Sequence, residues 1–140
     1  MQPHLTDESA SAKDDEDRGS ATVQLTLVVP VLLLMLLLIV QFALVWHAQH
    51  IAQAAASRAL ATARTQSGSA AMGQAQGEQT IAALGRRLLS EPSVRVQRTP
   101  TTVTVRVRGE AMAVVPGLRL AVAGQAAGPV ERVTTPKGTP

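Results

Sequence analysis

The sequence predicts an α+β membrane protein, with a long N-terminal transmembrane helix that extends out of the membrane, then a short helix and a small antiparallel β-sheet. Three observations support this prediction. Residues 25–46 form a run of 22 residues without charge. The chain then continues to residue 66 without Gly or Pro and is rich in Ala, a strong helix former. Farther along, valines alternate with polar residues, the pattern of strands with one buried face.

The apolar run at residues 25–46 is long enough to cross a bilayer. About 20 helical residues cover the roughly 30 Å hydrocarbon core. Pro30 removes one backbone hydrogen bond and is expected to bend the helix without ending it. Trp46 closes the run, and an amphipathic ring prefers the headgroup level of the membrane interface. We therefore expect a single-pass protein of the cell membrane, with a span over residues 25–46.

The segment before the span does not resemble a secretory signal. Residues 1–19 contain six acidic residues and only Lys13 and Arg18 as bases, a net charge of −4, whereas residues 20–140 carry +7. A signal peptide has a basic start and an apolar region of about 7–15 residues. The motif Ala52-Gln53-Ala54 nevertheless keeps signal-peptidase cleavage open as an alternative.

Composition argues against several classes of function. The chain has no cysteine, so it has neither disulfides nor a thiolate metal site. His47 and His50 have the spacing to share a metal on one helical face, but no third ligand is apparent. The arginines are scattered and no aromatic residue lies among them to stack bases, which argues against nucleic-acid binding. After residue 19 the acids are few, so we expect no enzyme and no cofactor; they are Glu78, Glu91, Glu110 and Glu131.

The helix predicted over residues 20–66 carries small residues at helical spacing on its outer half. Small side chains allow another helix to approach closely, so this surface is suited to packing against a partner subunit. The alternative is that Ala is present only as a favourable helix residue. The members of this small-residue stripe are Ala48, Ile51, Ala52, Ala55, Ala56 and Ala59.

A small α+β region is expected over residues 78–128, after a linker at residues 67–77 that is rich in Gly, Ser and Ala. The second helix is placed at residues 79–90, ended by Pro92, and is expected to cover the sheet. Its apolar face would be Ile81, Leu84 and Leu88. Strands are expected at residues 94–97, 102–108 and 118–126, with Val103, Val105 and Val107 buried. The tail, residues 129–140, is expected to be irregular.

The junction Gly19-Ser20-Ala21-Thr22-Val23-Gln24, followed directly by the apolar run, resembles the cleavage motif of type IV prepilin-like proteins. The whole layout resembles the TadE/TadG-like minor pseudopilins of the tight-adherence pilus system. The resemblance implies that a prepilin peptidase cuts between Gly19 and Ser20 at the cytoplasmic face, and that the C-terminal region is extracytoplasmic. It also implies a structural role with other pilin-like subunits and assembly machinery as partners.

One position departs from the family pattern. The family usually has Glu at the fifth mature position, and here that position is Gln24. A carboxylate there can pair with a neighbour's cationic amino terminus, whereas Gln offers only a neutral hydrogen bond. This difference favours a minor or anchoring subunit. Two alternatives remain: an uncleaved single-pass anchor that presents a small envelope-binding module, and a secreted hydrolase or inhibitor.

Overall fold

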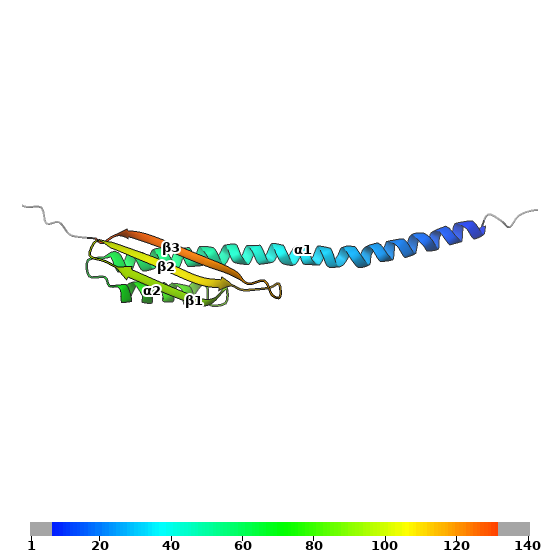
Figure 1. The fold of residues 1–140 in the computed structure, drawn as a ribbon. Helices are drawn as coiled ribbons and strands as arrows, with labels where there is room; N and C mark the ends of the chain where they lie inside the picture. The colour runs from blue at the N-terminus through cyan, green and yellow to red at the C-terminus, as the bar shows by residue number, and fades with distance from the viewer. Residues whose placement is uncertain (1–6, 132–140) are drawn as a thin grey trace, which may run out of the picture. The chain divides into compact units, whose positions relative to one another are not determined.

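The computed structural model describes the backbone of residues 7–131 and the side chains of residues 24–131. The strands form one antiparallel sheet in the order β1-β2-β3 (Figure 1). A long apolar helix, a short helix and a three-stranded antiparallel sheet confirm the predicted α+β class. The elements are α1 (Asp7–Arg64), α2 (Ala70–Leu84), β1 (Leu89–Arg98), β2 (Thr102–Ala111) and β3 (Leu120–Pro129).

The chain forms two compact units, residues 1–39 and residues 40–140. In the first unit, the described large apolar side chains, from Leu25 onward, are almost all exposed. Pro30 lies inside α1 and does not end it. Within residues 24–131, α1 is the one helix that is long and apolar enough to cross a membrane. These features are compatible with the predicted single-pass anchor.

The second unit has its core between the inner face of the sheet and the outer part of α1. Val103, Val105 and Val107 of β2 are fully buried, whereas Thr104 and Arg106 between them are exposed, as predicted. These valines pack with alanines of α1 from Ala48 to Ala63. Small and β-branched side chains fill this core, because the chain's aromatic residues lie in the apolar run.

Glycine makes the closest contact between α1 and the sheet. Gly124 of β3 is buried, and a Cβ added there would collide with the carbonyl group of Ala52 and would lie 2.7 Å from the backbone nitrogen of Gln53. Real Cβ atoms do not approach backbone atoms so closely. The backbone of β3 therefore lies directly against the backbone of α1, and only glycine fits between them.

The segment at residues 67–77 is not the expected linker, because α2 begins at Ala70. The Ser69 hydroxyl accepts a hydrogen bond from the Met72 amide at 3.1 Å and caps the helix. Gly73 and Gly77 lie at helix contacts: a Cβ at Gly77 would be 2.9 Å from Val94 Cγ1 and 3.3 Å from Ala59 Cβ. These two glycines, which suggested a flexible linker in the sequence, instead allow α2 to approach α1 and β1 closely.

The expected helix at residues 79–90 is likewise wrong at its C-terminal end. It ends before Gly85, and β1 begins at Leu89, five residues before the first predicted strand residue. Pro92 lies within β1, where the pairing with β2 shifts register between Ser90 and Ser93. Glu91 has a positive φ of 48° at this irregularity. Proline is tolerated at such a bulge, since it interrupts no regular ladder bond there.

The remaining strand bounds differ slightly from the prediction. β3 runs from Leu120 to Pro129, two residues later than the expected start and three later than the expected end. The Pro116-Gly117 turn precedes it, and Gly117 has a positive φ of 81°. Residues 132–140 of the expected irregular tail lie outside the described residues.

Burial of β2 leads to a first prediction about stability. Val105→Asp places a carboxylate without a partner in the core and is expected to lower the free energy of unfolding by about 3 kcal/mol or more. Thr104→Asp, on the exposed face, is the matched control and should change it by less than about 1 kcal/mol. Limited proteolysis of the membrane-bound protein would compare them. Equal protease sensitivity would contradict the assigned faces.

The contact at Gly124 leads to a second prediction. Gly124→Ala should force α1 and β3 apart and cost about 1–3 kcal/mol through overpacking. Gly128→Ala in the same strand is the control, because its Cβ would be 3.6 Å from the Leu60 side chain, an ordinary contact. Thermal unfolding in detergent should show a lower Tm for Gly124→Ala alone. Equal Tm values would show that the backbones are not in contact at this point.

Candidate functional site

The predicted cleavage site lies on α1. The backbone of Gly19 and Ser20 belongs to this helix, and their side chains lie outside the described ones. Gln24, the fifth position after the junction, is exposed on the same helix. The cleavage at this junction therefore stays a prediction from the sequence.

The small-residue stripe is placed differently from the expectation. Its members are at most 4% exposed and belong to the core under the chain's own sheet. They are helix-packing residues, but their neighbours are Gly124, Val94 and other residues of the same domain. The interpretation of the stripe as a surface for another subunit is corrected, because the chain itself covers it. The stripe is Ala48, Ile51, Ala52, Ala55, Ala56 and Ala59.

Trp46 is 71% exposed at the end of the apolar run. Its ring contacts His50 one turn later, edge to face, with the ring centroids 5.3 Å apart. Phe42 is also exposed, one turn before Trp46. Within the described residues, no group of three His, Cys, Asp or Glu side chains is close enough to hold a metal ion. Exposed aromatic side chains at the end of an apolar helix, here Phe42 and Trp46, are suited to a membrane interface.

Two glutamines of α1 form hydrogen bonds with the backbone of β3. Gln49 Nε2 donates to the Ala123 carbonyl at 2.6 Å, and Gln49 Oε1 accepts from the Ala123 amide at 3.2 Å. Gln53 makes the same pair of bonds with Gln125, at 3.0 and 3.2 Å. Each side-chain amide thus makes the pair of hydrogen bonds that a neighbouring strand would make, because it supplies one donor and one acceptor to one strand residue. The outer edge of β3 is covered along this stretch.

The pairing is possible because the spacing of residues along the helix matches the spacing of residues along the strand. Residues four apart on a helix are separated by about 6 Å along its axis. Residues two apart on a strand are separated by about 6.7 Å, and they direct their backbone groups to the same edge. Gln49 and Gln53 therefore match Ala123 and Gln125 when β3 runs in the same direction as α1.

Gln41 extends this row toward the N-terminus of α1, two helical turns before Gln49. Its polar side chain is fully buried, although it lies within an apolar run whose other side chains are mostly exposed. It donates to the Met112 carbonyl at 3.2 Å, and its Oε1 accepts from the amides of Val114 at 2.7 Å and Val115 at 3.3 Å. We call Gln41, Gln49 and Gln53 the glutamine row. The four-residue multiples between its members are the signal in the sequence that could have revealed it.

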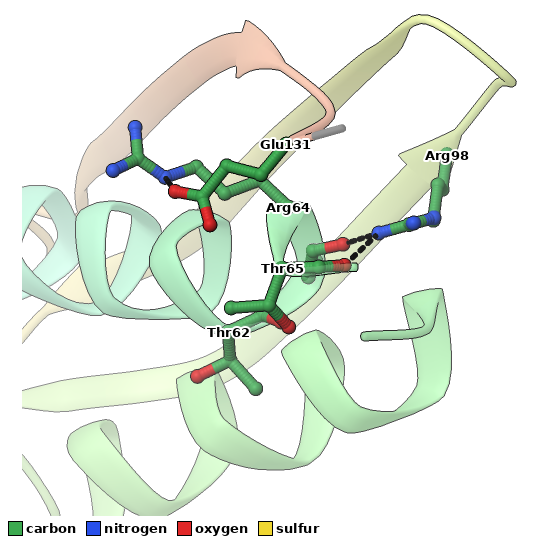
Figure 2. A network of polar contacts seen from close by, with 6 residues as sticks. Thr62, Arg64, Thr65, Arg98 and Glu131 are labelled. Atoms are coloured by element: carbon green, nitrogen blue, oxygen red, sulfur yellow. Dashed lines mark hydrogen bonds and ion pairs between the residues drawn. The ribbon is translucent and has the colours of Figure 1, made fainter. Parts of the chain in front are cut away.

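The C-terminal end of α1 is closed by groups at or just after the ends of the two edge strands, β1 and β3, at the same end of the sheet (Figure 2). Arg98 Nη1 donates to the carbonyl groups of Ala63 and Thr65, and the amide of Glu131 donates to the Arg64 carbonyl at 2.9 Å. The Glu131 carboxylate also lies 3.1 Å from Arg64 Nε. The last carbonyls of a helix have no partner within the helix and carry partial negative charge, so a guanidinium is well suited to them.

The exposed face of the sheet is basic. Arg95 of β1 lies directly opposite Arg106 of β2, and Arg108 follows on the same face. Like charges opposite one another repel, so this arrangement does not serve the stability of the sheet. The face is exposed and contains small or polar side chains of β3, including Ala123 and Gln125. It is an open basic surface on the side of the sheet away from α1.

The glutamine row leads to a third prediction. Gln53→Leu should remove both bonds to Gln125 and expose that amide, at a cost of about 1 kcal/mol or about 5-fold faster hydrogen exchange. Gln97→Leu, on the exposed face of β1, is the matched control. Hydrogen exchange read at Gln125 measures the effect. Unchanged exchange at Gln125 in the Gln53 variant would show that the side chain does not protect the strand edge.

The comparisons with known proteins agree with one part of the sequence analysis. Residues 19–60 match the family described as TadE-like protein. No curated protein and no solved structure matches the chain. The matched segment begins at Gly19 and covers the apolar run and the whole small-residue stripe. The predicted resemblance is thus confirmed: residues 19–60 of this chain form a TadE-like segment.

Proposed function

We propose that this chain is a minor pseudopilin of a tight-adherence, type IV-like pilus or of a related secretion apparatus. The observation that carries the proposal is the TadE-like segment at residues 19–60, which begins at the predicted cleavage glycine and continues into an exposed apolar helix. Its role is structural: it is held in the membrane by α1 and presents the small domain outside. Its partners are other pilin-like subunits, the assembly machinery and the prepilin peptidase.

The exposure of α1 supports a proposal for which part of the helix would contact other subunits. Beyond Ala48 one side of the helix is buried under the chain's own domain. Large side chains from Leu25 to Val40 are instead mostly exposed, and they present apolar surface to lipid or to another helix. We therefore place lateral packing in the apolar part, where van der Waals contact between helices drives association. The basic face with Arg95 and Arg106 is free for a soluble neighbour.

Two further points concern the membrane. Basic residues are even on the two sides of the span, Lys13 and Arg18 before it and Arg58 and Arg64 after it, so orientation follows from the family resemblance. That resemblance supports an orientation with the amino terminus in the cytoplasm and the sheet outside. Gln24 is exposed, in reach of a neighbouring chain, but it brings no charge to attract an amino terminus. This supports a minor subunit over a bulk pilin.

Cleavage after Gly19 is the prediction that tests the proposal. In cells with an active prepilin peptidase, the membrane-bound protein should begin at Ser20, and its net charge should rise from +3 to +7. Gly19→Leu should block the cut, because a branched side chain does not fit where a residue without Cβ passes. Ala10→Leu, in the same leader, is the control and should be cut normally. Intact mass of the purified protein measures both.

Two results would contradict the pseudopilin. An intact leader on the membrane-bound protein would favour the uncleaved single-pass anchor. A product in the medium that lacks residues 1–54 would indicate signal-peptidase cleavage and a secreted protein.

A further inference from the structure

The connection between β2 and β3 is apolar and exposed. Residues 111–118 read Ala-Met-Ala-Val-Val-Pro-Gly-Leu and contain no charged or polar side chain. Met112 is 46% exposed and Val114 is 36% exposed, although both are large apolar residues. The β1–β2 connection at the opposite end of the sheet contains Thr99, Pro100 and Thr101 instead. The two ends of the same sheet therefore differ in polarity.

The apolar connection lies beside Gln41, in the part of the apolar run that belongs to the second unit. Gln41 binds the backbone of Met112, Val114 and Val115. Gln41 precedes Trp46 by five residues, which is about 7.5 Å along the helix axis on the side of the apolar run. If Trp46 marks the headgroup level, residues 112–115 lie below that level, within the outer leaflet.

Several backbone groups of this connection have hydrogen-bond partners within the protein, as a medium with little water requires. Irregular backbone enters lipid only when its polar groups find partners in the protein. Gln41 supplies three such bonds. The Met112 amide donates to the Leu88 carbonyl at 3.0 Å, and the Leu118 amide donates to the Val115 carbonyl at 3.2 Å. Pro116 has no amide hydrogen to satisfy.

Charged residues flank the connection at its base. Glu110 at the end of β2 and Arg119 before β3 form an ion pair, with 3.7 Å between Oε2 and Nη1. The pair is substantially exposed and belongs in water or among lipid headgroups. Along the chain, a charged residue is thus followed by the apolar turn and then by another charged residue. A hairpin whose tip enters a membrane has this arrangement, with an apolar tip and charged residues at its base.

We propose that residues 112–118 insert into the outer leaflet of the bilayer beside the span, as a second membrane contact. We call these residues the membrane loop. The inference rests on the membrane anchoring in the proposed function. Lipid is the occupant that the observations favour, because the loop is continuous with the apolar run and is held to it by Gln41. The small domain then has two points of contact with the membrane, and its sheet is fixed relative to the surface.

Tryptophan fluorescence in vesicles tests the proposal with the full chain. The probe is phosphatidylcholine with bromine on the acyl chains, which quenches only indoles within the membrane. Val114→Trp with Trp46→Phe should show blue-shifted emission and quenching at least as strong as that of native Trp46. Thr104→Trp with Trp46→Phe, on the exposed sheet face, is the matched control and should remain unquenched. Met112→Trp provides a second loop position if Val114→Trp disturbs the fold.

The outcomes separate the loop from the span. Quenched Trp46 with unquenched tryptophan at both 112 and 114 would overturn the membrane loop while the anchor stands. Unquenched native Trp46 would mean that α1 is not inserted, and the proposed function would fail with it. Equal quenching at position 104 would mean that the whole domain lies on the lipid, which also overturns a loop-specific contact. Gln41→Leu should reduce quenching at position 114, since the loop loses its attachment to α1.

Discussion

The close approach of α1 to β3 is the constraint on which the rest of this structure depends. Gly124 has no side chain that would separate the two backbones, and it lies against the backbone of Ala52. Because the elements are this close, short glutamine side chains reach the strand edge from Gln49 and Gln53. The same approach brings Gln41 to the β2–β3 connection. A larger residue at position 124 would therefore disturb hydrogen bonds well away from the contact itself.

An exposed edge strand can pair with a strand of another chain. The two edge strands of this sheet are protected against such pairing in different ways. The glutamine row covers β3 with side-chain amides. In β1 the register shift between Ser90 and Ser93, with Pro92 inside it, interrupts the regular ladder. Both are recognised ways to discourage strand addition. Within the described residues the sheet has three strands, so two of the three are edge strands that need such protection.

Sequence patterns predicted those parts of the fold that depend on hydrophobic periodicity. The alternation around Val105 gave the buried face of β2, and the length of the apolar run gave the long helix. Helix α2 was misplaced because Gly73 and Gly77 have low helix propensity, and tertiary packing outweighs it. The small-residue stripe was predicted to pack against another subunit but packs against the chain's own sheet, because periodicity does not reveal whether the neighbour belongs to the same chain. Gln41 was missed because a single glutamine in an apolar run gives no signal by itself; the pattern appears only when its spacing of eight and twelve residues to Gln49 and Gln53 is considered.

The parallel course of α1 and β3 also determines how the domain responds to tension. Contacts of α1 with β3 and with the segments just before and after β3 extend from Gln41 to the ion pair of Arg64 with Glu131, about 35 Å along the helix. A pull along α1 acts on all of these contacts at once and parallel to their interface, so they resist as a group in shear. A pull across the sheet would instead separate them one after another. In the proposed pilus role, a pull on the helix would therefore load this small, aromatic-free domain along the length of the interface.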